Sequence, residues 1–281
     1  MRSLYDVAAP AKLNLFLHIT GRRADGYHLL QSIFMLIDWC DTLHFEVRAD
    51  GFITRHDLTE TLPPDDLITR AARALQLWTQ CPLGADIWVE KVIPSQAGMG
   101  GGSSDAATCL LALNRLWKLN LPRSQLAALA LRLGADVPFF LSGRNAWVEG
   151  IGEIITPIEV PPARFVVVKP PDGAETASIF SSPELKRDTI PATISGFAAH
   201  PYGFGRNDLQ TVAIGQCPQI AQALEWLESA GLEGRMTGSG SAVFAQTLDG
   251  ADLRGVPDTW RVRTCSNLAV HPLQGWASSD S

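Results

Sequence analysis

Hydrophobic and polar residues alternate near the start of the chain in the pattern of a strand. From residue 7 to residue 20, leucine or isoleucine occupies the odd positions 13 to 19, whereas Lys12, Asn14 and His18 occupy even positions. Successive side chains of a strand point to opposite faces. Lys12 and Asn14 are therefore predicted to lie side by side on one face. A solvated strand face is the alternative interpretation.

A tight turn is predicted after this strand. Residues 21–26 end in the pair Asp25-Gly26, a combination that favours hairpin turns. Tyr27 and His28 come directly after it. Taken as isolated residues, these two are more often packing or surface groups than ligands.

Apolar residues at helical or alternating spacing predict the remaining elements. Helices are predicted from a cap at Asp65 or Asp66 to about residue 78, and over residues 103–119, 124–133 and 219–230. Strands are predicted over residues 43–47, 85–93, 165–168, 242–246, 261–265 and 268–270. Residues 178–206 are expected to be rich in loops, and the polar tail from Gly275 is expected to be frayed.

Strands and helices mix without strict alternation of the two, which predicts an α+β fold. The composition shifts after Pro157, where a pair of prolines at 161 and 162 precedes a solid apolar strand. We therefore predict two domains, residues 1–158 and residues 159–281.

The most distinctive stretch of the chain is a glycine-rich loop. It comprises Pro94, Ser95, Gln96, Ala97, Gly98, Met99, Gly100, Gly101, Gly102, Ser103 and Ser104. Four of the five positions from 98 to 102 are glycine, so backbone N–H groups can close on an anion. With Ser103 as the predicted N-cap of the next helix, the loop adds free amides to the positive end of a helix dipole. This pattern predicts a phosphate site, and a purely structural turn is the alternative.

The spacing of the glycines excludes two familiar nucleotide-binding motifs. The loop contains no G-x-x-x-x-G-K-S/T sequence, so it is not a Walker loop. It does not fit G-x-G-x-x-G either.

Asp136 is a second candidate for chemistry. It lies between a predicted helix end at Gly134 and the apolar run that begins at Pro138. Burial of a carboxylate there is unfavourable unless a cation or hydrogen-bond donors compensate. A loop aspartate that bonds to nearby backbone is the alternative interpretation.

Composition and charge narrow the classes of function. The chain has 281 residues, 46% of them hydrophobic, and a formal net charge of −6 without a run of basic residues. A broad electrostatic footprint for nucleic acid is not expected. Five scattered cysteines without C-x-x-C spacing indicate neither a disulfide framework nor a zinc site. No apolar run approaches the ~18–20 residues of a membrane span, so we expect a cytoplasmic protein without a membrane partner.

Five segments together resemble the GHMP kinase superfamily. They are residues 10–17, 23–28, 98–106, 134–140 and 237–244. The resemblance implies a two-domain GHMP kinase fold of the α+β class, with the active site in the interdomain cleft. The first two segments resemble, more narrowly, the members that act on a cytidine-diphosphate-linked methylerythritol. That likeness implies transfer of the γ-phosphoryl of ATP, with Mg²⁺, to the 2-hydroxyl of this polyol in the non-mevalonate isoprenoid pathway.

The resemblance also implies roles for individual residues. The catalytic residues are Asp136 and Lys12. The ATP-binding residues are Asp66, at the adenine, and residues 94–104, around the phosphates. The substrate-binding residues are Asn14, Tyr27, His28, Phe180, Gly238 and Ser239, with Tyr27 and Phe180 on either side of the cytosine.

Three positions depart from the family's pattern. Asp66 stands where asparagine is usual, and an ionised acid cannot donate a hydrogen bond to a base. Asp105 also stands where asparagine is common, and its side chain is expected to face away from the phosphates. Met99 replaces a leucine, a mild packing change. No acidic pair accompanies the loop, so Mg²⁺ is expected on ATP oxygens with Ser103 or Ser104.

Two alternative functions stay open at this point. One is another kinase of the superfamily, acting on homoserine, mevalonate or a sugar, none of which needs an aromatic sandwich. The other is a non-catalytic RNA-binding protein, because the amino-terminal half of the superfamily resembles a ribosomal-protein fold. The acidic net charge counts against the second.

Overall fold

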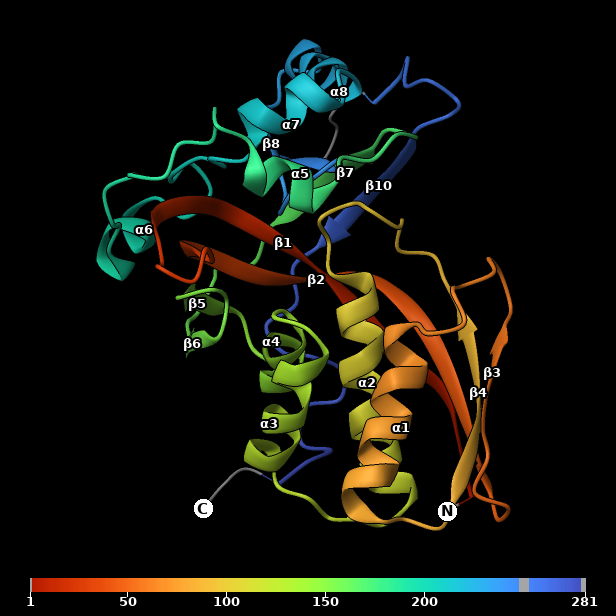
Figure 1. Ribbon diagram of the computed structural model, residues 1–281. Helices are drawn as coiled ribbons and strands as arrows, with labels where there is room; N and C mark the ends of the chain where they lie inside the picture. The colour runs from red at the N-terminus through yellow and green to blue at the C-terminus, as the bar shows by residue number, and fades with distance from the viewer. Residues whose placement is uncertain (1, 248–252, 279–281) are drawn as a thin grey trace.

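The structure is a computed structural model that describes residues 2–247 and 253–278. The described residues form two sheets with helices packed against them (Figure 1). The first sheet contains β1 (Ser3–Arg22), β2 (His28–Arg48), β3 (Ile53–Asp57), β4 (Gly84–Glu90), β5 (Ala146–Glu149) and β6 (Ile154–Pro157). The second contains β7 (Arg164–Lys169), β8 (Gly234–Met236), β9 (Val243–Thr247) and β10 (Arg261–Ser266).

The helices fall into two groups along the chain. The first group is α1 (Leu67–Thr79), α2 (Gly101–Leu116), α3 (Arg123–Leu133) and α4 (Val137–Ser142). The second group is α5 (Thr176–Ser181), α6 (Ile194–Ala199), α7 (Gln210–Gln216) and α8 (Gln219–Ser229). In Figure 1 the first group lies in the lower half, beside the long strands, and α5, α7 and α8 lie near the second sheet. This arrangement is the expected α+β organisation.

The strands β1 and β2 form a long antiparallel hairpin, joined by a turn over residues 23–27 that overlaps the turn predicted at residues 21–26. Their pairing shifts register between Asn14 and Leu17. Such an irregularity bends a strand. The residues of β1 on either side of it accordingly pack in different hydrophobic cores. Leu15 packs in one hydrophobic cluster, whereas Leu17 and Ile19 pack in another.

The polar face predicted for β1 is not solvated. Lys12 and Asn14 are 3% and 1% exposed, so the solvated-face alternative is wrong. Their side chains are hydrogen-bonded to each other, which confirms that they lie side by side. Other segments of the chain cover this face, as described below for the site.

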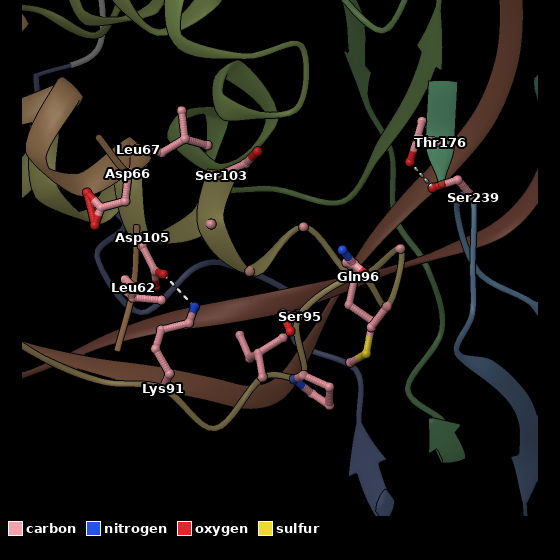
Figure 2. A pocket seen from close by; sticks show the side chains of 18 of the residues that line it. Leu62, Asp66, Leu67, Lys91, Ser95, Gln96, Ser103, Asp105, Thr176 and Ser239 are labelled. Atoms are coloured by element: carbon pink, nitrogen blue, oxygen red, sulfur yellow. Dashed lines mark hydrogen bonds and ion pairs between the residues drawn. The ribbon is translucent and has the colours of Figure 1, made fainter. Parts of the chain in front are cut away.

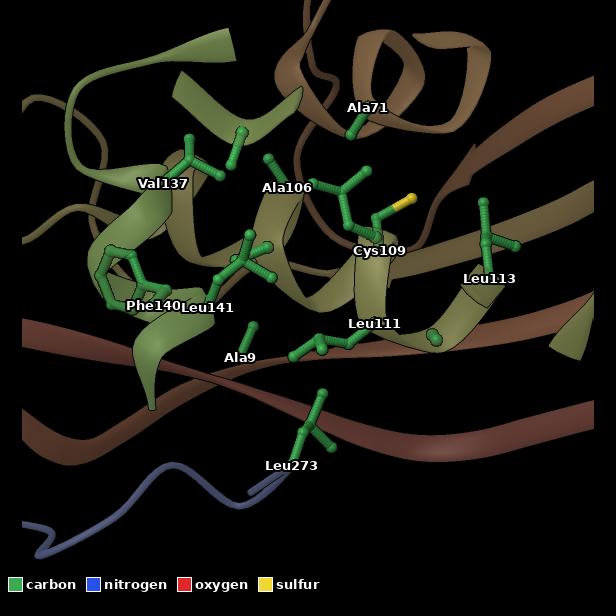
Figure 3. Packing of buried hydrophobic residues seen from close by; sticks show 14 of the residues in the cluster. Ala9, Ala71, Ala106, Cys109, Leu111, Leu113, Val137, Phe140, Leu141 and Leu273 are labelled. Carbon is green, nitrogen blue, oxygen red and sulfur yellow. The ribbon is translucent and has the colours of Figure 1, made fainter. Parts of the chain in front are cut away.

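The largest core lies around α2, between the first sheet and the other helices of its group. Figure 3 shows Cys109 of α2 near Ala71 of α1, and Val137 of α4 in the same cluster. Leu273 joins this core from the far end of the chain. The segment after β10 therefore returns to the first half.

Two predictions for the end of the chain are wrong for this reason. Residues 268–270 form no strand; a single antiparallel bridge joins Arg144 and Val270. The tail expected to fray from Gly275 instead buries Ala277, which is 4% exposed, in the core around α2. Residues 279–281 of that tail lie outside the described residues.

The connection between β6 and β7 separates the two sheets. The division that we proposed between residues 158 and 159 falls in this connection. It remains a proposal, because residues after β10 pack on the first half.

Two glycines allow the tightness of the packing to be tested. A Cβ at Gly84, the first residue of β4, would lie 2.0 Å from the carbonyl oxygen of Phe52. We expect Gly84→Ala to lower the free energy of unfolding by about 1–3 kcal/mol, because backbone must move to admit the methyl group. At Gly215 in α7 a Cβ meets nothing within 4 Å, and Gly215→Ala should instead raise stability by about 0.5–1 kcal/mol. Urea unfolding of both variants checks this; effects of the same sign would contradict it.

Candidate active site

The glycine loop connects the end of β4 to the start of α2 and presents its backbone to a cavity. Gly98 and Gly100 have φ angles of 70° and 72°, which glycine adopts without strain. The side chains of Ala97 and Met99 are buried in the core. Residues 93–103 line a cavity of about 510 Å³ (Figure 2). Its wall at the loop is therefore formed largely by backbone groups.

The helix α2 begins inside the glycine run. Gly100 occupies the N-cap position and makes no side-chain capping bond. The prediction that Ser103 caps this helix is wrong, because the glycines themselves enter the helical conformation and place Ser103 within the first turn. The N–H groups of that turn have no intrahelical partner, and the helix dipole adds positive potential. This end of the cavity is suited to an anion such as a phosphate.

A second small-residue loop, residues 237–241, packs directly on the first. A Cβ on Gly98 would lie 2.2 Å from the carbonyl oxygen of Thr237, and one on Gly238 would lie 2.6 Å from that of Gly98. Gly238, predicted to bind substrate, lies at this contact between loops and lines neither of the two cavities described here.

Lys12 reaches the glycine loop from β1. Its ammonium group donates to the carbonyl oxygen of Gly98 at 2.9 Å and to Oδ1 of Asn14, and it lies 3.8 Å from Oδ2 of Asp136. Burial lowers the pKa of Lys12, and the Asp136 carboxylate opposes that shift. The structure thus brings the two predicted catalytic residues together at the loop.

Asp136 stands at the N-terminus of α4, a helix that the sequence analysis missed. Its side chain makes no capping bond and is 31% exposed. The apolar residues after it, Phe139 and Phe140, turn into the core because they are helical. The carboxylate is consequently left accessible, with acceptor positions that the helix does not use.

Asp66 lines the first cavity, but its carboxylate is already engaged. One oxygen accepts the N–H of Thr69 at 2.7 Å and so caps α1, as predicted. The other oxygen pairs with Arg55. The Asp66 carboxylate therefore stabilises the wall of the cavity by holding the start of α1 and the Arg55 side chain in place.

Lys91 bridges two buried carboxylates at the foot of the loop. Its ammonium group donates to Asp105 at 2.5 Å (Figure 2) and to Asp41. Two carboxylates around one ammonium leave an excess buried negative charge. Burial raises the pKa of Asp105 to about 7, and Lys91 opposes that shift. Asp105 is thus directed at Lys91, in a cluster that no sequence signal predicted.

The serines of the predicted site separate into different environments. Ser103 lines the first cavity, whereas Ser104 turns into the core; within the described residues its hydroxyl has no hydrogen-bond partner. Ser239, predicted to bind substrate, lines the first cavity and is hydrogen-bonded to Thr176 at 2.7 Å (Figure 2).

The predicted aromatic residues meet at a second cavity. Tyr27, His28 and Phe180 all line a space of about 510 Å³. The ring centroids of His28 and Phe180 lie 5.2 Å apart. Arg187 donates to the His28 ring at 2.9 Å, a contact that the sequence analysis did not foresee.

The short helix α5 contributes to both cavities. Thr176, at its start, lines the first cavity, and Ala177 and Phe180 line the second. The first cavity also receives Ser239, so both halves of the chain form its wall. This placement is the cleft that the sequence analysis expected.

Metal and membrane features can be stated for the described residues only. Among them, no three His, Cys, Asp or Glu side chains are grouped to hold a metal ion. None of their helices has the length and apolar character that a bilayer span requires.

Comparison with known proteins identifies the family. Residues 66–144 match the GHMP kinases N terminal domain, and residues 195–261 match the GHMP kinases C terminal domain. A protein of Albidiferax ferrireducens named 4-diphosphocytidyl-2-C-methyl-D-erythritol kinase is 67% identical over 280 residues, covering 100% of this chain and 98% of that protein. The chain belongs to the 4-diphosphocytidyl-2-C-methyl-D-erythritol kinase family of GHMP kinases.

Solved structures agree with this assignment. A crystal structure of 4-(cytidine 5'-diphospho)-2C-methyl-D-erythritol kinase has a TM-score of 0.76 and 31% identity, covering 92% of this chain and 98% of its own. A homoserine kinase from Cytophaga hutchinsonii, with a TM-score of 0.70 and 13% identity over 96% of each chain, shares the fold alone. The predicted family, its ATP-dependent kinase class and its two-domain α+β fold are confirmed.

The buried cluster at Lys91 generates a prediction about pH. Asp105 has a pKa of about 7 in the folded protein, above that of an aspartate in an unfolded chain. Stability is therefore lost as the pH rises from about 4 to 7. Asp105→Asn keeps the shape without the charge, so the loss of unfolding free energy between pH 5 and 7 should shrink by roughly 1–2 kcal/mol. Urea unfolding at both pH values measures this free energy. An equal loss of unfolding free energy in the unsubstituted protein and in Asp105→Asn would contradict the raised pKa of Asp105.

Proposed function

We propose that this chain transfers the γ-phosphoryl group of ATP to the 2-hydroxyl of 4-diphosphocytidyl-2-C-methyl-D-erythritol, in the non-mevalonate isoprenoid precursor pathway. The name of the relative that matches the whole chain supports this substrate. The observation that carries the proposal is the meeting of Lys12 and Asp136 at Gly98, because it puts a cation and an acceptor of protons beside an anion-binding loop.

The first cavity is the proposed ATP site. Its amide-lined loop and the N-terminus of α2 suit the triphosphate. The end of the cavity near Asp66 takes the adenine. Because Thr69 and Arg55 occupy the Asp66 carboxylate, this residue supports the adenine pocket through α1 and not by donating to the base.

The proposed chemistry needs only positioning and charge. Asp136 accepts the proton of the 2-hydroxyl, whose oxygen forms a bond to the γ-phosphorus as the bond from that phosphorus to the β–γ bridging oxygen breaks. ADP leaves with that bridging oxygen. Lys12 stabilises the negative charge on the transferring group and keeps the Asp136 carboxylate ionised.

Mg²⁺ is proposed as the metal cofactor. When bound, it supplies charge neutralisation at the phosphates. The oxygen donors available to it are the phosphates themselves and the hydroxyl of Ser103, which lines the first cavity. Oxygen donors fit a hard cation. Ser104 is no longer a candidate, because its hydroxyl is buried in the core.

The second cavity is the proposed site of the cytidine. Tyr27 and Phe180 offer aromatic faces to the cytosine, and such stacking contributes about 1–3 kcal/mol per base. Stacking tolerates any base, so discrimination falls to the polar groups of His28. Asn14, which is hydrogen-bonded to Lys12, is proposed to contact the polyol beside the catalytic pair. Both substrates are water-soluble phosphates, so we place the reaction in the cytoplasm, without a nucleic-acid or membrane partner.

Replacement of the proposed base gives the sharpest test of the mechanism. Asp136→Asn removes the proton acceptor while keeping the side chain's size, and should lower kcat about 10²–10⁴-fold. The affinity for ATP should stay within about twofold, because Asp136 lies outside the lining of the ATP cavity. Coupled ADP-release kinetics and calorimetric titration of ATP measure the two quantities. Near-normal turnover in the variant would exclude the role of base.

A panel of acceptors tests the substrate assignment. ADP release should be fast with the cytidine-linked polyol and absent with homoserine, mevalonate or simple sugars. The uridine-linked polyol should lose on the order of 10⁴-fold in kcat/KM, because it mispairs with the polar groups of the site. Phe180→Ala should lose only about 5- to 150-fold, the value of one stacking contact.

The control for the aromatic residue is Phe52→Ala, since Phe52 is 68% exposed and lines neither cavity. Equal losses for the uridine substrate and for Phe180→Ala would show that stacking alone selects the base. Turnover of another alcohol in preference to the cytidine substrate would overturn the assignment.

A further inference from the structure

Arg187 joins the two aromatic walls of the second cavity without lining it. Its Nε donates to Nε2 of His28 at 2.9 Å. Its Nη2 donates to the carbonyl oxygens of Phe180 and Ser182 at 3.2 and 2.7 Å, and its Nη1 to that of Leu185 at 2.9 Å. One guanidinium group therefore holds the ring of His28 and the end of α5 in one network.

The contact with His28 determines where the imidazole carries its proton. A guanidinium group is always protonated and can only donate. Nε2 of His28 must therefore accept, which leaves the ring neutral with its proton on Nδ1. Within the described residues, Nδ1 has no protein hydrogen-bond partner. His28 lines the cavity, so this N–H is the polar group that its side chain offers there.

The contacts with the carbonyl groups fix the other wall. Phe180 and Ser182 lie at the C-terminal end of α5, where carbonyl groups lack intrahelical partners. A cation at this end also complements the helix dipole. Arg187 thus sets the position of the Phe180 backbone relative to the His28 ring.

We propose that Arg187 is a positioning residue for base recognition: it locks His28 in the neutral form that donates from Nδ1, toward an acceptor on the edge of a pyrimidine ring. The identity of that ring rests on the proposed function. The tautomer itself does not, because it follows from the contact between Arg187 and His28 in the protein alone. Arg187 neither contacts the reacting atoms nor lines the cavity.

The charged and titratable groups around His28 favour the neutral ring. Burial comes first among the causes that lower its pKa, followed by the positive charges of Arg187 and Arg22. Asp25 and Tyr27, from the same turn as Arg22, also line the cavity. The Asp25 carboxylate is paired with Arg23 at 2.7 Å. This ion pair weakens the electrostatic attraction between Asp25 and a protonated imidazole.

The first test reads the tautomer directly, without any substrate. Histidine is labelled with ¹⁵N in the full chain, and the His28 signals are identified from their loss in His28→Gln. In the unsubstituted protein at pH 8, Nδ1 should carry the proton and Nε2 should have the shift of an unprotonated nitrogen. In Arg187→Met the proton should be shared between the two nitrogens. A proton on Nε2 in the unsubstituted protein, or an unchanged His28 in the variant, would overturn the proposal.

The second test reads the consequence for recognition. With the cytidine-linked polyol, KM of the unsubstituted protein should be flat between pH 5.5 and 8. KM of Arg187→Met should rise roughly 2- to 5-fold at pH 8, because only the fraction of rings with the proton on Nδ1 can donate. KM should fall again as the pH is lowered toward 5.5, because loss of the Arg187 charge raises the pKa of His28 and a protonated ring donates from both nitrogens. kcat should change by less than about twofold.

The control is Arg48→Met, which removes a guanidinium fork paired with Asp50 and Asp86, away from both cavities. It should lower stability without making KM depend on pH. An increase of KM in Arg187→Met that is the same at every pH would mark a merely structural role and overturn the proposal. If the unsubstituted protein did not phosphorylate the cytidine-linked polyol, the proposed function would be wrong. The tautomer of His28 would still be tested by the first experiment, which uses no substrate.

Discussion

The contact between the backbones of Gly98 and Thr237 is the constraint on which the site depends. A Cβ on Gly98 would lie 2.2 Å from the Thr237 carbonyl oxygen, so only glycine allows the two loops to meet. The hydroxyl of Thr237 accepts the N–H of Asn14 at 2.9 Å, and the carbonyl of Met99 accepts that of Lys12 at 2.9 Å. One strand and two loops, from both halves of the chain, are joined at this point. The join fixes the Lys12 ammonium relative to the amides of the glycine loop.

Two lysines whose side chains are largely buried are compensated differently. Lys91 has a carboxylate on either side, so its charge is more than neutralised. Lys12 has a carbonyl, an amide oxygen and one carboxylate at 3.8 Å, beyond hydrogen-bond distance. Burial lowers the pKa of Lys12 because this compensation is incomplete. In the mechanism that we propose, the transferring phosphoryl group completes the compensation of Lys12, whereas the Lys91 charge is already compensated within the protein.

Local patterns in the sequence predicted local structure, but they did not predict contacts between residues far apart in the sequence. The Asp66 cap, the turn at Asp25 and the pairing of Lys12 with Asn14 each follow from neighbours in sequence, and all three were confirmed. Only residues 43–47 of β2 were predicted, because residues 31–37 are buried on both faces and lose the alternation that marks a strand. Contacts such as that of Arg187 with His28 carry no sequence signal, since 159 positions separate the partners.

The short helix α5 contributes residues to both of the cavities that we propose for the two substrates. Its first residue, Thr176, is hydrogen-bonded to Ser239 at the first cavity, and its Phe180 lines the second cavity. Its stability must come from its anchors, because so short a helix is not stable alone. Arg187 supplies the anchor at the C-terminal end, through carbonyl groups that only a donor can satisfy. The sites that we propose for the base and the nucleotide therefore share one anchored element, although the two cavities are lined by different residues.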